Sequence, residues 1–572
     1  MRLLLTALFG AALPLFAQTI AITGAQVVDG TGAPPRAATV VIRGGRIAAV
    51  GQGIEPPAGA ALIDARGKTL LPGLFDLHTH LLASGGGKDL DWGKILKLYL
   101  AHGVTTVADM STYPEQFEPL RALIRNGLAA PRLLMAGRFS TPGGHGAEGG
   151  RGDFHTQMVQ TPREAREAVR RIAAYKPDVI KVFTDGWRYG VDTDMTSMDE
   201  ATLKALVEAA HGLGLKVVSH TVSVEKAKIA ARAGVDVVNH GIGDGNLDAE
   251  AVRLMKEQNT GYVQTLAVYE PRTANVAEAR KRRWAHLMAN GPLARDGGVT
   301  LGAGTDAGMP GTPHGVSSLH ELELMVRGGL TPLEAIAAAT SGSARLMGLE
   351  GDRGTIAEGK LADLVLIGGN PVANIAEIHQ VERVWLGGKE QDREALLAAV
   401  AKPGPTPLPA VPAAEVLDDF ESADGRSKVD TLWLNNTDGG HDHALMSYQR
   451  TPRTPSNHAL TILAEMTPKD RPFAAMVLPL SKGAVAPVDA SRFAGIEFEA
   501  RGEGEYGLTL RSREAAARAP FRAAPEWKKV RVPFRALGSA NLRDLTALEF
   551  VIARPAGARA FLEIDNVRFF AR

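Results

Sequence analysis

The chain has 572 residues, a net charge of +1 and 45% hydrophobic residues. It is too long for one ordinary domain and balanced enough to be globular, so we expect two or three domains. The balanced charge gives no indication of binding to nucleic acid or to an anionic membrane surface. Because the chain has no cysteine, disulfides and cysteine nucleophiles are excluded, and any metal must be held by His, Asp, Glu or a modified Lys.

The first 17 residues resemble a secretory signal peptide. An apolar run from Leu3 to Phe16 follows a positively charged start, and residues 15–17 offer a cleavage site before Gln18. The run is shorter than the ~18–20 residues that span a bilayer. A buried N-terminal helix is the alternative. We therefore expect a secreted or periplasmic protein with no membrane span after processing.

Two segments that flank the centre of the chain have the same character. Residues 18–70 contain short strand patterns and tight turns, and residues 353–392 repeat this pattern around turn signals such as residues 368–371. The N-terminal segment is too short to form a stable domain alone. We expect the two segments to pair into one small composite β-sandwich domain.

The region between them, residues 71–352, alternates short apolar strands with helical stretches. Eight strand–helix units in this length fit an α/β fold of the (β/α)₈ TIM-barrel type, which is typically ~250 residues long. The expected strands cover residues 73–77, 105–108, 133–135, 179–183, 216–219, 235–239, 261–266 and 300–304.

The composition changes again after the predicted barrel. Residues 393–414 are expected to form a linker, because five prolines fall within residues 402–414. Residues 415–572 then show an all-β pattern that is typical of a jelly roll. Its strongest expected strands cover residues 493–500, 506–511, 529–532, 548–552 and 561–569.

Polar side chains that can bind metal stand at the ends of five predicted barrel strands. The first strand ends in His78-Thr79-His80, and residues two apart on a strand share a face, so both imidazoles can reach one cation. The carboxyl ends of barrel strands converge on one mouth, where active sites lie. The groups at the other four strand ends are Lys181, His220, His240 and Asp306.

Lys181 is unusual in such a setting. A lysine at a strand end is normally a surface residue, but an ammonium inside a histidine-rich mouth would repel a metal ion. A lysine carbamylated by carbon dioxide carries an anionic carboxylate, which is able to bridge two cations. We infer this modification from the setting.

The order HxH, Lys, His, His, Asp resembles the amidohydrolase superfamily. Further stretches are similar to its imidazolonepropionase-related and prolidase-like branch, and the resemblance covers about residues 20–392. These stretches are residues 71–80, 103–107, 143–146, 304–308 and 354–364.

The resemblance implies a centre of two divalent metal ions, with zinc as the expected metal. His78 and His80 would hold one ion, and His220 and His240 the other. Carbamylated Lys181 would bridge them. Asp306 would complete the first site and serve as the catalytic acid and base. One departure is the loop of residues 184–190, where the family often has a small glycine-rich loop, and this leaves the substrate preference open.

Four further residues are candidates for binding the substrate. His145 lies in a glycine-rich loop whose freedom can bring an imidazole to the substrate. Arg188 or Tyr189 could hold a carboxylate or an oxyanion, with solvated loop positions as the alternative. For His314 a structural role in its loop and a substrate role are both open.

We expect an exported binuclear amidohydrolase that cleaves the amide bond of a dipeptide or an N-acyl-amino acid. Two alternatives within enzymes are a cyclic amidohydrolase, similar to imidazolonepropionase, and a deaminase. Lys181 argues against the deaminase, because deaminases usually work with one metal. A binding protein on an inactive barrel is the alternative outside enzymes.

The C-terminal region resembles the CIA30 family (complex I intermediate-associated protein 30), a galactose-binding-like jelly roll, over about residues 415–572. The stretches that carry this resemblance are residues 417–421, 438–440, 527–534 and 562–567. A glycan or a protein is the partner that we expect for this domain. Because every proposed metal ligand precedes residue 307, we expect the domain to be dispensable for chemistry. The oligomeric state stays open, with a homo-oligomer as one option.

Overall fold

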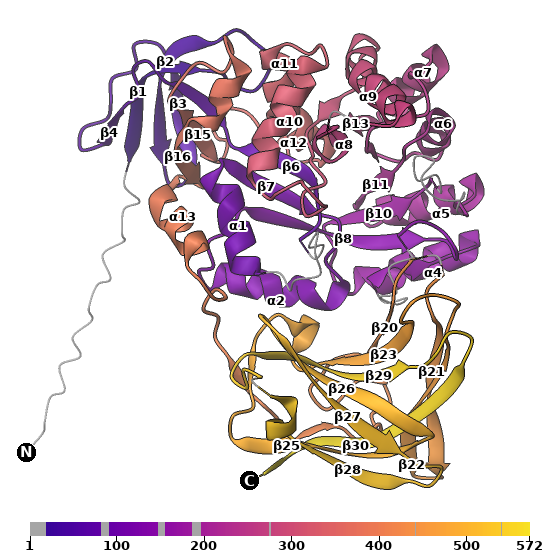
Figure 1. The fold of residues 1–572 in the computed structure, drawn as a ribbon. Coiled ribbons are helices and arrows are strands. Elements are labelled where there is room, and N and C mark those ends of the chain that lie inside the picture. The colour runs from indigo at the N-terminus through magenta and orange to yellow at the C-terminus, as the bar shows by residue number, and fades with distance from the viewer. Residues whose placement is uncertain are drawn as a thin grey trace, which may run out of the picture.

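The computed structural model describes residues 19–81, 91–146, 155–185, 196–273, 276–440, 442–538 and 540–571. The predicted signal peptide of residues 1–17, and Arg188 and Tyr189, lie outside the described residues. Figure 1 shows the N-terminal strands and the barrel in the upper half of the molecule and a separate β-domain below. Within the described ranges, no helix combines the length and the apolar character needed to cross a membrane.

The centre of the chain forms a nearly closed parallel barrel, as predicted. Its strands are hydrogen-bonded in the order β14-β13-β12-β11-β10-β8-β7-β6, and β9 (Gln157–Met158) pairs with β8. A bridge from Thr79 to Ala307 links β6 to the segment after β14. The eight strands are β6 (Leu74–Thr79), β7 (Val104–Asp109), β8 (Arg132–Ser140), β10 (Val179–Phe183), β11 (Lys216–His220), β12 (Val237–Asn239), β13 (Gly261–Val263) and β14 (Leu301–Gly302).

The barrel strands are apolar because both of their faces are covered. Every residue of β6, β7 and β10 is buried. Side chains such as Phe75, Val218 and Val263 fill the barrel interior, while helices cover the outside, as is general for parallel sheets. This double burial explains why the strands can be recognised as short apolar runs.

Helices follow most of the barrel strands, and helix α4 illustrates why they form. Thr161 caps its N-terminus by accepting a hydrogen bond from the backbone of Glu164, and Pro162 occupies the first helical position. Its buried residues recur every three to four positions, which places them on one face. The helices and helical turns of the barrel are α1 (Trp92–Ala101), α2 (Pro114–Arg125), α4 (Pro162–Ala173), α5 (Glu200–His211), α6 (Val224–Arg232), α7 (Ala249–Glu257), α8 (Leu266–Tyr269), α9 (Glu278–Asp296), α10 (Val316–Arg327), α11 (Pro332–Ala337), η1 (Ala338–Gly342) and α12 (Ser343–Leu346).

The two flanking segments pair with each other, as predicted, and share one mixed sheet. Its order is β17-β16-β15-β5-β1-β2-β3, with β4 beside β1. Trp385 is fully buried in its core. The elements are β1 (Ile20–Val27), β2 (Arg36–Arg43), β3 (Arg46–Gly51), β4 (Ala61–Asp64), β5 (Thr69–Pro72), β15 (Leu364–Ile367), η2 (Ile375–His379), β16 (Val381–Leu386) and β17 (Lys389–Gln391). Helix α13 (Arg393–Ala401) follows, and the Arg393 side chain donates to the Ala101 carbonyl at the end of α1.

The C-terminal region is all-β, as predicted, and consists of two sheets around one core. One sheet has the order β18-β24-β29-β23-β20 with β26 and β27 attached, and the other has β21-β22-β30-β25-β28 with β19 attached. Aromatic residues such as Phe498, Phe550 and Phe569 fill the core. The elements are β18 (Val411–Pro412), β19 (Val416–Asp418), β20 (Leu434–Thr437), β21 (Leu445–Thr454), β22 (Asn457–Glu465), β23 (Phe473–Pro479), η3 (Lys482–Ala484), β24 (Val488–Asp489), β25 (Phe493–Gly502), β26 (Gly504–Ser512), β27 (Ala516–Ala523), β28 (Lys528–Pro533), η4 (Phe534–Leu537), β29 (Leu545–Ala553) and β30 (Arg559–Ala571).

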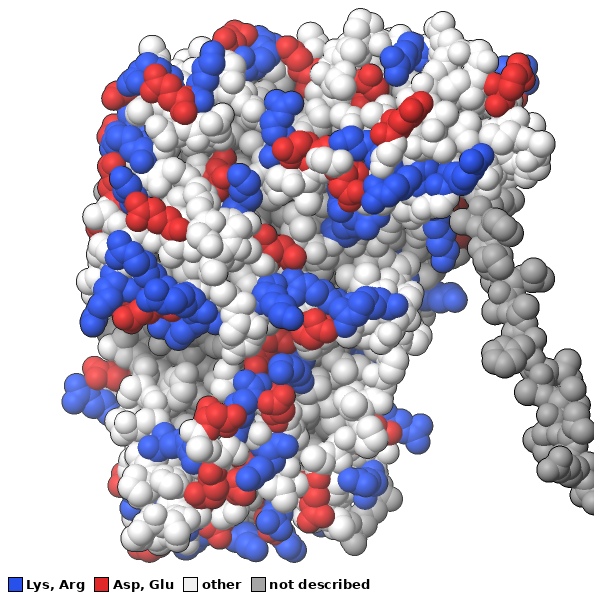
Figure 2. Space-filling model, turned by 180° about the vertical axis from the view of Figure 1, so that it is seen from behind, with Lys and Arg blue, Asp and Glu red and all other residues white. Residues whose placement is uncertain are grey.

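The charged side chains are mixed on the surface. On the face shown in Figure 2, Lys and Arg side chains are interspersed with Asp and Glu over both the barrel and the C-terminal domain. This distribution agrees with the net charge of +1. A protein with such a surface has no strong long-range field of one sign on that face.

Candidate metal centre

The predicted metal-binding residues meet at the carboxyl ends of the barrel strands. His78 and Lys181 lie in β6 and β10, His220 ends β11, and His240 directly follows β12. The ring centroids of His78 and His240 are 4.4 Å apart, and those of His220 and His240 are also 4.4 Å apart. The His80 ring lies 5.3 Å from that of His78. Four chain segments that are remote in sequence thus converge on one mouth.

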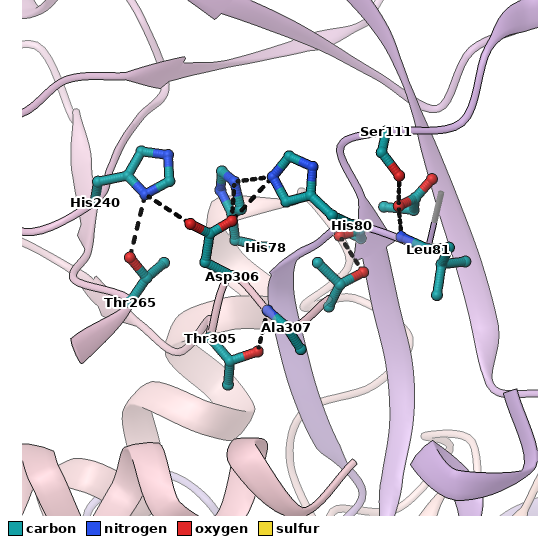
Figure 3. Close-up of polar contacts among 12 residues, drawn as sticks. His78, His80, Leu81, Ser111, His240, Thr265, Thr305, Asp306 and Ala307 are labelled. Carbon is teal, nitrogen blue, oxygen red and sulfur yellow. Dashed lines mark hydrogen bonds and ion pairs between the residues drawn. The ribbon is translucent and has the colours of Figure 1, made fainter. Parts of the chain in front are cut away.

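Three of these residues form a compact group of possible ligands. One side-chain atom each of His78, His240 and Asp306 lies within 4.8 Å of the other two, and all three residues are buried. Figure 3 shows Asp306 between the two imidazoles, with His80 on the other side of His78. One Asp306 oxygen, Oδ1, is 2.9 Å from His80 Nε2 and 3.6 Å from His78 Nε2, and Oδ2 is 3.9 Å from His240 Nδ1.

The protonation states of this group suit a metal. Burial lowers the pKa of His78 well below its usual value. Burial and the neighbouring His78 likewise lower the pKa of His240. Both rings are therefore neutral near pH 7, and neutral imidazoles and carboxylates are ligands for divalent metals such as zinc. The buried Nδ1 of His78 has no hydrogen-bond partner within the described residues, so this atom is also open to a cation.

The backbone at the mouth adopts a costly conformation at three neighbouring strand ends. His240 has φ 82°, Asp306 has φ 60° and Thr265 has φ 50°. The left-handed region costs a residue with a side chain ~1–2 kcal/mol, and Thr is a particularly poor occupant because it is β-branched. Such strain gathers where function requires a side chain to point in one direction. Here it turns His240 and Asp306 toward each other.

Lys181 is buried beside this group. Its side chain is among the largest fully buried ones, and its Nζ has no hydrogen-bond partner in the described part of the chain. Burial lowers the pKa of Lys181 well below its usual value, although the charge of Asp306 opposes this. Burial therefore favours the neutral, nucleophilic form of the amine.

Several supporting residues were not assigned a role from the sequence. Asp76 accepts hydrogen bonds from the Thr305 hydroxyl (2.7 Å) and backbone (3.1 Å), from the Ser318 hydroxyl (2.7 Å) and from the His78 backbone (3.3 Å). It thereby joins β6 to the segment that carries Asp306. Its position two residues before His78 on the same face of a strand was the available signal.

Two hydroxyl groups orient His240 from the side opposite β11. The Thr265 hydroxyl lies 3.2 Å and the Tyr269 hydroxyl 3.3 Å from His240 Nδ1. Partners of this kind fix the orientation of a metal-binding imidazole. Tyr269 belongs to the short helix α8, which the sequence pattern did not predict.

Two of the four proposed substrate residues lie at the mouth. The His145 ring is 4.3 Å from that of His220 and 5.1 Å from that of Phe183. His314 Nδ1 is 2.8 Å from the Tyr99 hydroxyl, and burial together with the nearby His80 lowers the pKa of His314 to about 4. The other two, Arg188 and Tyr189, belong to the residues that the structure does not describe.

Comparison with known proteins decides the family. The sequence pattern described as "Amidohydrolase family" matches residues 69–390. The chain belongs to the amidohydrolase family. As an amidohydrolase it is a metal-dependent hydrolase of C–N bonds, and its buried site of His78, His240 and Asp306 fits the metal centre of that family.

Relatives of known activity are similar to this amidohydrolase over about two thirds of its length. Ochratoxinase from Aspergillus niger is 29% identical over 428 residues, which cover 65% of this chain and 86% of that protein. Imidazolonepropionase from Deinococcus radiodurans is 25% identical, covering 62% of this chain and 92% of that one. A crystal structure of a Xaa-Pro dipeptidase with methionine bound in its active site is 28% identical with a TM-score of 0.57, covering 65% of this chain and 100% of that chain.

Proposed function

We propose that this amidohydrolase cleaves the amide bond of a dipeptide or an N-acyl-amino acid. The observation that carries the proposal is the buried group of His78, His240 and Asp306 beside the buried amine of Lys181. The similarity to a Xaa-Pro dipeptidase and to ochratoxinase supports an amide as the bond that is cleaved.

Two divalent ions, with zinc as the metal, are the proposed cofactors. His78, His80 and Asp306 would hold one ion, and His220 and His240 the other. Lys181 would serve both ions as a carbamate: its amine would attack carbon dioxide, an N–C bond would form as one C–O π bond breaks, and one proton would leave the nitrogen, so that the product carries a carboxylate. A buried amine without a hydrogen-bond partner in the described residues supports this step, because it is both nucleophilic and unsatisfied.

A bound divalent metal would lower the pKa of its water to about 7 and would polarise the carbonyl of the substrate. Asp306 accepts the proton that the attacking water gives up and delivers it to the leaving nitrogen, because amines are poor leaving groups unless protonated. Its place beside His78 and His80 puts one carboxylate oxygen at the centre of the mouth. Asp76 and the Thr305 backbone hold Asp306 in position for both transfers.

The substrate is proposed to carry a free carboxylate next to the cleaved amide. His145 and His314 contact the substrate from the mouth, and Arg188 and Tyr189 bind its carboxylate, since a guanidinium binds carboxylate in a bidentate way. Support comes from the His145 ring, which packs on the His220 ring. The partner of the barrel is thus a small molecule or a dipeptide.

Several further proposals concern the rest of the chain. Residues 1–17 are a signal peptide that directs the protein to the periplasm or the exterior. The units proposed are residues 18–70 with 353–392, residues 71–352, a linker of residues 393–414 and residues 415–572. The last of these is a CIA30-like jelly roll, supported by its two facing β-sheets, and it binds a glycan or a protein.

A hydrolysis screen tests the proposed reaction. Purified protein with zinc added is assayed against dipeptides and N-acyl-amino acids, with Asp306→Asn as the matched inactive variant. We expect turnover of at least one class by the native chain only. Absence of turnover in both classes, with metal bound, would refute the substrate class and favour a cyclic amide or a deamination substrate.

The carboxylate requirement has its own test. Amidation of the C-terminus of the best dipeptide should raise KM strongly, because the proposed ion pair is lost. Equal kcat/KM for the free and the amidated dipeptide would remove Arg188 and Tyr189 from this role.

A further inference from the structure

The C-terminal domain touches the barrel at the start of one helix. In Figure 1, α2 lies on the side of the barrel that faces this domain. The turn η3 approaches α2 so closely that a Cβ on Gly483 would lie 2.8 Å from the Cα of Gln116 and from the Glu115 carbonyl. The Gln116 side chain donates to the Gly483 carbonyl at 3.0 Å, and Val485 packs into the barrel's hydrophobic core with Phe117 nearby in the same cluster.

A buried ion pair reinforces this contact. Arg426 lies 2.6 Å from Glu115, whose side chain is only 1% exposed, and the Leu432 backbone N–H donates to the other Glu115 oxygen at 3.3 Å. A buried carboxylate that loses its partner is strongly destabilising, because its charge remains without compensation. The two domains are therefore held in a specific arrangement at this point.

The contacted turn is directly connected to the metal centre. Helices of a barrel begin on the mouth side, so the first turn of α2 follows the β7–α2 loop of residues 110–113 at the mouth. Asp109, the last residue of β7, accepts hydrogen bonds from the Leu81 backbone (2.7 Å) and from the Ser111 hydroxyl (2.9 Å). Figure 3 labels both donors, Leu81 and Ser111. Leu81 directly follows His80. Arg426 is thus connected to His80 through the first turn of α2, the β7–α2 loop and Asp109, which holds the residue after His80.

We propose that the C-terminal domain is a fixed part of the catalytic unit, in which Arg426 and Gly483 position the β7–α2 loop and, through it, His80. This replaces the expectation that the domain is dispensable for chemistry. The inference rests on the proposed metal centre but not on the proposed substrate. Arg426 and Gly483 are positioning residues, since neither touches the metal-binding side chains.

The test measures metal affinity in the full-length chain. Arg426→Ala removes the partner of Glu115, and Gly483→Ala pushes η3 from α2 without any change of charge. Arg559→Ala is the matched control, because Arg559 pairs with Glu465 on the exposed surface of the same domain, with the two side chains 81% and 44% exposed. Each metal-free protein is titrated with Zn²⁺ against a chromophoric chelator, well below its melting temperature.

Loss of a residue that orients a metal ligand typically weakens metal affinity ~10–100-fold. We expect a loss in this range for Arg426→Ala and Gly483→Ala, with partial recovery in Arg426→Lys and no change in Arg559→Ala. Hydrogen exchange of residues 109–116 in the metal-free protein should accelerate in the same two variants. If Arg426→Ala does not fold, Gly483→Ala decides alone.

The proposal stands if either folded variant binds Zn²⁺ at least threefold more weakly than the control. It is overturned if both bind within threefold of the control, even if their melting temperatures fall, because the contact would then be structural only. Failure of the proposed substrate would leave this measurement unaffected, since no substrate is present.

Discussion

Asp76 allows a quantitative prediction, because its four hydrogen bonds have different chemical characters. One oxygen accepts two backbone N–H groups and the other accepts two hydroxyls. In Asp76→Ala the two backbone donors lose this acceptor, and a buried donor left without a partner costs ~1–3 kcal/mol. The Thr305 N–H retains a second acceptor, the His78 carbonyl at 3.3 Å. We therefore take the lower value for the Thr305 N–H, and expect Asp76→Ala to lower the free energy of unfolding by about 2–4 kcal/mol in total.

Asp76→Asn should be much milder. Its amide oxygen can still accept both backbone N–H groups, and its NH₂ group faces two hydroxyls that can rotate to accept. Burial raises the pKa of Asp76 to about 6, so the native fold gains little from the charge itself. We expect a loss below about 1 kcal/mol, the net worth of one ordinary hydrogen bond.

Calorimetric unfolding of the metal-free proteins, together with Zn²⁺ titration, measures this difference. Asp470→Ala is the control, since Asp470 is 85% exposed and a surface change usually stays within ±0.5 kcal/mol, a rough limit. The reasoning is refuted if Asp76→Asn is as damaging as Asp76→Ala, because charge rather than the supply of acceptors would then be the contribution of Asp76.

Three further predictions concern the metal centre. Lys181→Ala should lose bound metal, and added acetate or propionate should restore part of it; full metal content in the variant would exclude a bridging role. Asp306→Asn should lower kcat by roughly 10²–10⁴-fold, the usual worth of an acid–base group, whereas turnover within tenfold of the native rate would exclude Asp306 as the base. Burial lowers the pKa of His314 to about 4 in the folded protein, compared with about 6.5 in the unfolded chain. The neutral His314 side chain therefore makes its full contribution to stability above a pH of about 6.5. This stability, up to about 3 kcal/mol, should be lost as the pH falls from 6.5 toward 4, and His314→Gln should flatten that part of the unfolding profile.

The barrel, and the meeting of these polar side chains at its mouth, were predictable for a physical reason. A strand of a parallel barrel is buried on both faces, so it forms a short apolar run, and a polar residue at its end is conspicuous. His220 and Asp306 stand out in this way. The expected strand of residues 216–219 overlaps β11, and the expected strand of residues 300–304 ends two positions before Asp306. Because the carboxyl ends of the strands of a barrel meet at one mouth, the barrel fold alone predicts that these residues lie close together.

Features that depend on distant contacts could not be predicted. Asp76 is an acidic residue inside an apolar run, and its role becomes visible only when Thr305 and Ser318 are placed beside it. Glu115 and Arg426 are 311 positions apart in the chain, and the sequence around neither residue predicts that they form an ion pair. The left-handed backbone at His240 and Thr265 is likewise imposed by the surrounding structure, since local preference opposes it.

The composite sheet has a consequence for how the protein is made. Strand β5 pairs with β15 through Leu71 and Val365, so a strand that is synthesised early must wait for a partner 294 positions later. At a synthesis rate of roughly 5–20 residues per second, this delay is about 15–60 s. Contacts of such high sequence separation also form slowly because the intervening loop must first close. The nascent chain therefore presents an unpaired strand edge while the whole barrel is being made. We expect chaperones that protect such edges to determine how much active protein a cell obtains.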